Sequence, residues 1–139
     1  TGLNAIAVCD HNSAGNVAAV QRAGKACGLA VFPGIEITSS EEVHILGLLP
    51  DIAAAMELQS KVYRSLPGRN DENVFGMQVI ANEFAEVLGF EEHLLSGATT
   101  LNCSHSLSWS EFQPRSYHCW WSESEQSLIR SQLAKGLPP

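Results

Sequence analysis

The chain lacks three features that would each point to a definite class of protein. It has only 8 Lys and Arg against 15 Asp and Glu, and this net charge of −7 argues against broad electrostatic binding to nucleic acid. No apolar run approaches the length of a membrane span, and no signal-peptide pattern opens the chain. The 4 cysteines form no Cys-x-x-Cys pair, so disulfides are not expected, and Cys9 and Cys27 are interpreted as small buried hydrophobes. We therefore expect a cytoplasmic protein with no membrane partner.

Three short segments with acidic residues and histidine stand out against this background. Each lies at the end of, or inside, an apolar run: Cys9-Asp10-His11, Pro33-Gly34-Ile35-Glu36 and Glu42-Val43-His44-Ile45-Leu46-Gly47. Residues 5–8 and 30–32 are predicted strands, and residues 15–27 a helix that Asn12 and Ser13 cap and Gly28 ends. A crossover helix makes the two strands parallel, which brings His11 and Glu36 to the C-terminal edge of the sheet. Enzymes of the α/β class place their chemistry at that edge.

The second and third segments are expected to form a hairpin. Residues 32–38 and 43–49 read as strands joined by Ser39-Ser40-Glu41-Glu42, so Glu36 and His44 would be opposite or diagonal neighbours, roughly 5–8 Å apart. Imidazole and carboxylate groups suit zinc, manganese or iron better than calcium. His11, Glu36 and His44 are thus candidate metal ligands, and Gly34 would let the backbone approach a ligand closely.

The remaining chain divides near residue 101. Asp51 is expected to cap a helix over residues 52–66 that residues 67–71 end, and residues 77–80 and 86–88 suggest a short hairpin. Residues 102–127 then hold 8 serines and all 3 tryptophans without apolar periodicity. A shifted reading frame or a spliced tail would produce such a change, and we expect residues 102–139 to pack poorly. His105 and His118, each near a cysteine, imitate a zinc site, but their spacing gives it little support.

The order AVCDHNS, FPGIEITS and EVHILGLLPD, followed by LGF and GATTL, resembles the PHP (polymerase and histidinol phosphatase) domain over roughly the first 101 residues. That family consists of metal-dependent phosphoesterases. The resemblance implies an α/β fold, here a partial, distorted (β/α)7 barrel with a β-α-β core over residues 1–101 and a divergent, irregular tail over 102–139. It also implies a phosphatase that acts on a small phosphorylated metabolite or nucleotide through metal-activated water. Short oligonucleotides are the only nucleic acid expected as substrate.

The resemblance also implies roles for single residues. His11 matches a metal-binding histidine, with Asp10 beside it as a lesser ligand or orienter. Glu36 matches a glutamate that bridges two metals, and His44 a histidine on the next strand. Asp10, His11 and Glu36 are accordingly the expected catalytic residues, and His11, Glu36 and His44 the ligands of zinc, manganese or iron. Which metal, which substrate and which oligomeric state apply are left open.

Several departures from the family pattern favour an alternative. No histidine precedes residue 10, where the family has a His-x-His strand, and no Asp-x-His pair occurs in the chain. We therefore expect an incomplete copy of the domain, and the alternative function is a non-catalytic remnant that binds metal weakly. Each candidate also has an ordinary structural explanation. Asp10 and His11 could simply end a strand, Glu36 could be a surface residue, and His44 could be a hydrogen-bonded core histidine.

Overall fold

A nine-residue strand, β2 (Ala30–Thr38), organises the structure. In the computed structural model, which describes residues 2–102, β2 pairs in parallel with β1 (Ala5–Val8) and antiparallel with β3 (His44–Leu48). The predicted parallel pair and hairpin are therefore both confirmed, and the fold is mixed α/β. Over residues 2–102 the sheet has three strands in the order β1-β2-β3 and does not close into a barrel. The expectations for His105, His118 and the rest of 103–139 lie outside the described residues.

The crossover between β1 and β2 contains helix α1 (Val17–Ala26). It begins two residues later than predicted, at an N-cap of Asn16, and Asn12 and Ser13 do not cap it. Asn12 instead has a left-handed φ of 53° and is fully buried, because its side chain bonds to other segments. Gly28 follows the helix with a φ of 74°, which glycine adopts without steric cost, so the predicted stop is confirmed.

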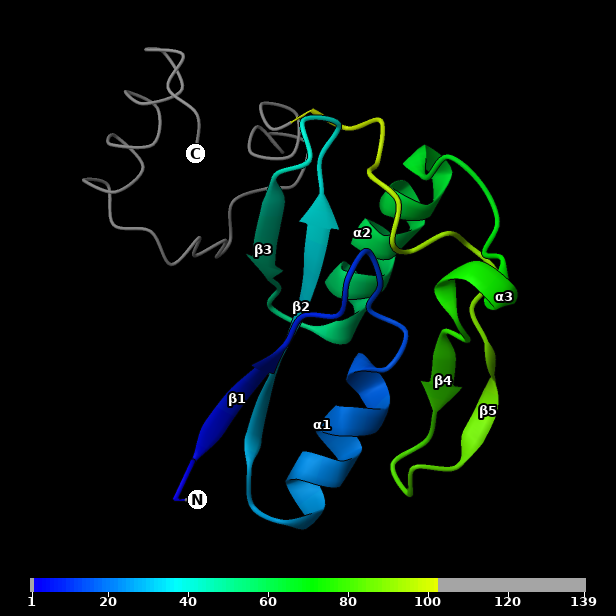
Figure 1. Ribbon diagram of the computed structural model, residues 1–139. Coiled ribbons are helices and arrows are strands. Elements are labelled where there is room, and N and C mark those ends of the chain that lie inside the picture. The colour runs from blue at the N-terminus through cyan, green and yellow to red at the C-terminus, as the bar shows by residue number, and fades with distance from the viewer. Residues whose placement is uncertain (1, 103–139) are drawn as a thin grey trace, which may run out of the picture.

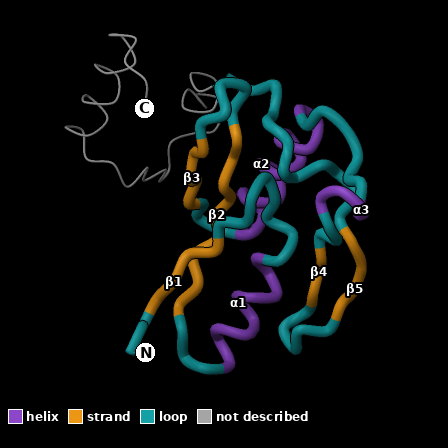
Figure 2. The backbone as a smooth tube through the Cα atoms, viewed as in Figure 1, coloured by secondary structure: helices purple, strands orange, loops and turns teal. Residues whose placement is uncertain are grey.

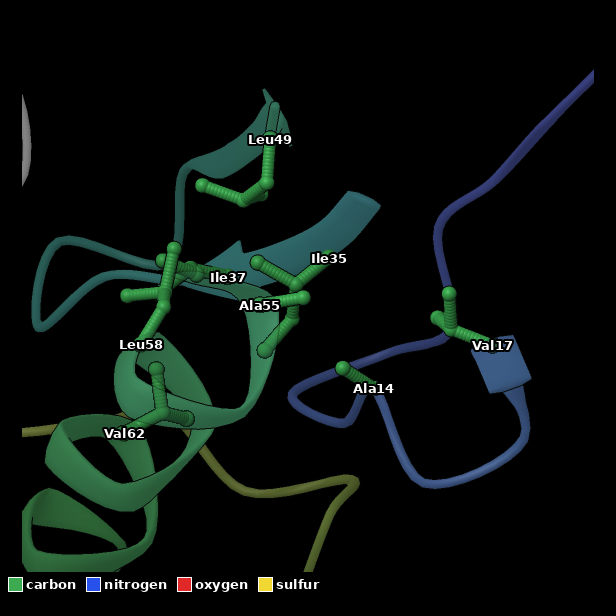
Figure 3. Close-up of a cluster of buried hydrophobic side chains, with 8 residues drawn as sticks. All are labelled: Ala14, Val17, Ile35, Ile37, Leu49, Ala55, Leu58 and Val62. Carbon is green, nitrogen blue, oxygen red and sulfur yellow. The ribbon is translucent and has the colours of Figure 1, made fainter. Parts of the chain in front are cut away.

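Helix α2 (Ile52–Ser65) covers the same side of the three strands as α1 (Figure 1). The Asp51 side chain accepts a hydrogen bond of 2.8 Å from the Ala54 N–H, so the predicted cap is confirmed. The core lies between the helices and the sheet (Figure 3), and its fully buried or nearly buried members are Ala14, Val17, Ile35, Ile37, Leu49, Ala55, Leu58 and Val62. Burying one such branched side chain contributes about 1.5–3 kcal/mol. Since strand residues alternate between faces, burial of Ile35 and Ile37 turns Glu36 to the opposite face.

The last described part of the chain forms a smaller unit. Helix α3 (Glu72–Phe75), which was not predicted, precedes the antiparallel strands β4 (Val79–Ala81) and β5 (Val87–Phe90). This hairpin lies beside α1 (Figure 2), where the Arg22 guanidinium forms an ion pair of 2.9 Å with Glu83. The short hairpin expected from the sequence is thus present, shifted by one or two residues.

Cys27 is exposed rather than buried, because it caps the C-terminus of α1, where its thiol donates to the Gly24 carbonyl. The expectation that it is a buried hydrophobe was wrong. None of the helices within residues 2–102 is both long enough and apolar enough to span a membrane.

Candidate metal centre

The site begins where the chain leaves β1. Residues 10–12 continue alongside β2, where His11 and Glu36 form a single parallel bridge. The Glu36 N–H donates to the Asp10 carbonyl at 3.0 Å, and the Asn12 N–H donates to the Glu36 carbonyl at 2.6 Å. These bonds place His11 directly beside Glu36 at the C-terminal edge of the parallel pair, as the sequence predicts.

The hairpin brings His44 to the same place. In the register of β2 and β3, Thr38 lies opposite His44 and Glu36 lies opposite Leu46, so Glu36 and His44 are diagonal neighbours on one face. Their side chains meet in a hydrogen bond of 2.7 Å between His44 Nδ1 and Glu36 Oε1. The ring of His44 also stacks on the ring of His11, with centroids 5.1 Å apart and planes inclined by 18°. Three side chains from three segments therefore gather at one point.

This cluster is open to solvent. The side chains of His44 and Glu36 are 54% and 30% exposed, and they lie on the face of the sheet that the helices do not cover. Because the Glu36 carboxylate accepts the Nδ1–H of His44, Nε2 is the ring nitrogen that carries the lone pair.

The donor atoms suit a divalent transition metal in type but are not arranged around a vacant centre. Within residues 2–102, no group of three or more His, Cys, Asp or Glu side chains has the geometry of a metal site. Two contacts explain this: Glu36 Oε1 and His44 Nδ1 satisfy one another, and His11 Nε2 forms a hydrogen bond with the Thr38 hydroxyl. The two imidazoles and the carboxylate fit such an ion in chemistry.

Asp10 does not join the other three side chains. Its carboxylate accepts a long hydrogen bond of 3.4 Å from the Asn16 amide, while its carbonyl receives the N–H groups of Glu36 and Ser13. The contacts made by Asp10 are therefore those of a residue that shapes the loop beside His11. The role of lesser ligand or orienter stays a prediction.

The packing of neighbouring strands explains a glycine at position 34, which is not the reason that the sequence suggested. A Cβ on this residue would lie 2.5 Å from the Cys9 sulfur, 2.8 Å from the Gly47 carbonyl oxygen and 3.0 Å from the Val8 carbonyl oxygen. Atoms of Val8, Cys9 and Gly47 therefore fill the space beside Gly34. Cys9, partly buried in this contact, has a raised pKa because of burial first, and because of the negative charges of Glu36 and Asp10.

A second polar cluster was missed from the sequence. The Glu91 carboxylate accepts hydrogen bonds from the ring Nδ1 of His93 at 2.5 Å and from the Tyr63 hydroxyl at 2.9 Å, and the Tyr63 and His93 rings stack at 4.1 Å. The Tyr63 hydroxyl also bonds to the Ser13 hydroxyl at 2.9 Å. The adjacent letters Glu91-Glu92-His93 were the only signal for this cluster, and their partner Tyr63 lies on α2, 28 residues from Glu91.

Ionisation in this second cluster is shifted by its surroundings. The pKa of Tyr63 is raised, above all by burial and also by the charge of Glu91. Burial acts to raise the pKa of Glu91 as well, but the hydrogen bonds from His93 and Tyr63 outweigh it, and the pKa lies below its usual value. Glu91 is thus held as a carboxylate by its neighbours.

Comparisons of the chain with protein-family models, with curated proteins and with solved structures each find no match.

Proposed function

We propose that this protein is a metal-dependent phosphoesterase that acts on a small phosphorylated metabolite or nucleotide. The observation that carries the proposal is the meeting of His11, Glu36 and His44, which are separated by 25 and 8 residues in the sequence. Two imidazoles and a carboxylate at an exposed sheet edge are the ligand types of zinc, manganese and iron enzymes. In this proposal His11, Glu36 and His44 hold the metal.

Each residue has a task that its contacts support. Glu36 and His44 already meet through Nδ1 of the ring, and a metal held by both residues would take the place of that hydrogen bond. Asp10 acts from the loop, where its carbonyl holds the backbone of Glu36 in place. When bound, the metal would polarise a phosphoryl oxygen and supply a hydroxide nucleophile near neutral pH.

Charge supports a requirement for a cation. Glu36 and Asp10 would repel a phosphate group, and the ion pairs of Arg22, Lys61 and Arg69 are made with the carboxylates of Glu83, Glu57 and Glu92. A bound divalent ion would reverse the sign of the local charge. We also propose, from the resemblance to the PHP domain, that β1-α1-β2-β3 is part of a PHP-type barrel and that residues 1–101 are a portion of that domain.

The test is hydrolysis of p-nitrophenyl phosphate with manganese or zinc. Because the family pattern implies further ligands from a preceding His-x-His strand, we expect the 139-residue chain to be no faster than its Glu36→Ala variant. The same chain joined to the residues encoded directly upstream should turn over the substrate. That activity should be lost in Glu36→Ala and His11→Ala and kept in His93→Ala, which alters a histidine outside the site.

Two results would decide against or refine the proposal. An extended chain with no metal-dependent turnover, or with turnover that Glu36→Ala leaves unchanged, would show that the site does not hydrolyse phosphoesters. Turnover by the 139-residue chain that depends on Glu36 would support the chemistry and show that further ligands come from within these residues.

A further inference from the structure

We infer that Asn12 is a positioning residue that fixes His11 against Glu36 and Thr38. Asn12 is 0% exposed, although its side chain is polar. A buried amide needs hydrogen-bond partners, since leaving it unsatisfied destabilises the fold. The partners of Asn12 lie on two segments that are distant in the sequence, and both border the site.

The first set of partners is on β2. The Asn12 N–H donates to the Glu36 carbonyl at 2.6 Å, and the Asn12 Oδ1 accepts the Thr38 N–H at 3.0 Å. Glu36 bonds to His44, and the Thr38 hydroxyl bonds to the His11 ring. Asn12 therefore bonds to the two β2 residues, Glu36 and Thr38, whose side chains contact His44 and His11 respectively.

The second set is on the segment after β5. The Asn12 Nδ2 donates to the Leu95 carbonyl at 2.7 Å and to the Gly97 carbonyl at 2.9 Å. Two residues later, the N–H and hydroxyl of Thr99 both donate to the Thr38 carbonyl, at 2.9 and 2.7 Å. Residues 95–99 are thus hydrogen-bonded to Asn12 and Thr38, which border the site.

Backbone conformation supports the choice of asparagine. The φ of 53° at Asn12 is left-handed, a conformation that asparagine adopts more readily than most residues. Aspartate has the same shape and accepts the Thr38 N–H, but its ionised carboxylate cannot donate to the Leu95 and Gly97 carbonyls. Glycine keeps the backbone conformation and removes all three side-chain bonds. Asn12→Asp therefore tests the two bonds that the amide donates, and Asn12→Gly tests the whole side chain while keeping the backbone conformation.

Gln78 provides a matched control. Its Nε2 donates to two carbonyls, that of Glu91 at 3.0 Å and that of His93 at 2.6 Å, and its Oε1 accepts the Leu95 N–H at 3.0 Å. Gln78→Glu makes the same change from amide to carboxylate on the same number of bonds. The two bonds that it removes are made to Glu91 and His93, and no bond to β2 is changed.

The test is the contact between the His11 and His44 rings, observed by NMR as cross-peaks between ring protons with no metal added. Wild type and Gln78→Glu should show these cross-peaks. Asn12→Asp and Asn12→Gly should lose them, while cross-peaks among the methyl groups of the core cluster that contains Ile35 and Val62 report an intact core. Persistence of the ring contact in both Asn12 variants with an intact core would overturn the inference.

A measurement on the unaltered chain covers the case in which the Asn12 variants do not fold. The Thr38 N–H donates to the Asn12 side chain, so the inference expects its hydrogen exchange to be strongly slowed. Exchange at the rate of a free, exposed amide would overturn it.

A zinc titration of the same proteins rests on the proposed function, whereas the ring contact does not. Loss of a residue that orients ligands typically weakens metal binding 10–100-fold, and we expect a loss of at least about tenfold in Asn12→Gly and none in Gln78→Glu. Absence of zinc binding by wild type would count against the proposed metal site and leave the ring-contact result to decide the role of Asn12. Equal zinc affinity in wild type and Asn12→Gly would overturn the positioning role.

Discussion

His44 and His93 each form a hydrogen bond with a glutamate through the same ring nitrogen, Nδ1. The Nδ1 of His44 bonds to Glu36 and the Nδ1 of His93 bonds to Glu91. Their other neighbours differ, since His44 stacks on a second histidine and His93 stacks on a tyrosine. The Glu91 side chain is also less exposed, at 16% against 30% for Glu36. The first contact therefore belongs to a cluster with two imidazoles, those of His11 and His44, while the second joins α2 to the segment after β5.

Glu91 should make stability depend on pH in the acid range. Its pKa in the folded protein lies below the usual 4.5, because hydrogen bonds from His93 and Tyr63 favour the carboxylate. A lowered pKa stabilises the fold at pH values above the unfolded pKa, and this stabilisation is lost as the pH falls through the folded pKa. Urea unfolding between about pH 6 and pH 3.5 should therefore show wild type losing more free energy of unfolding than Glu91→Gln.

The neighbouring Glu92 supplies the control. It pairs with Arg69 at the surface, where both side chains are more than two-thirds exposed and such pairs contribute little. Glu92→Gln should follow the wild-type pH profile. Parallel profiles for wild type and Glu91→Gln would contradict the assignment of acid sensitivity to Glu91.

At the scale of elements, local patterns predicted the strands and helices that border the site. The apolar run before Asp10, the run from Ala30 and the Asp51 cap each determine structure through neighbours in the sequence, and β1, β2 and α2 form as expected. The diagonal placement of Glu36 and His44 followed from the four-residue turn. Asn12 was misassigned as a helix cap because its partners, Leu95 and Gly97, are 83 and 85 residues away. No local pattern contains that information.

Gly34 should be required for the packing of the three strands. Alanine there would bring its Cβ within 3.0 Å of the backbone oxygens of Val8 and Gly47 and of the Cys9 sulfur, so the strands must separate. Overpacking of this kind costs about 1–3 kcal/mol, and Gly34→Ala should lower the free energy of unfolding in urea by that amount.

Gly89 on β5 is the matched position, because a Cβ there meets nothing within 4 Å. Gly89→Ala should change the free energy of unfolding by no more than about 0.5 kcal/mol in the destabilising direction. Similar losses in both variants would show that the crowding at Gly34 does not determine its cost.

At the scale of the whole molecule, the sheet has one covered face and one bare face in residues 2–102. The helices pack on Ile35 and Ile37, while the opposite face has exposed Phe32 and, across from Glu36, exposed Leu46. The expected hairpin made Glu36 and His44 opposite or diagonal neighbours, but the sequence did not reveal that their side chains would bond to each other. That contact depends on side-chain rotamers, which follow from packing rather than from residue type.

The claim that His11, Glu36 and His44 together hold a divalent metal is tested most directly by calorimetric titration of the purified chain with zinc and manganese. The variants are His11→Ala, Glu36→Gln and His44→Ala, and His93→Ala serves as the control, since it removes a histidine with the same carboxylate contact. We predict that wild type and His93→Ala bind the ion with equal affinity. Each site variant should bind at least about tenfold more weakly, a loss of about 1.4 kcal/mol. No binding by wild type, or an affinity that the three site variants leave unchanged, would contradict the claim.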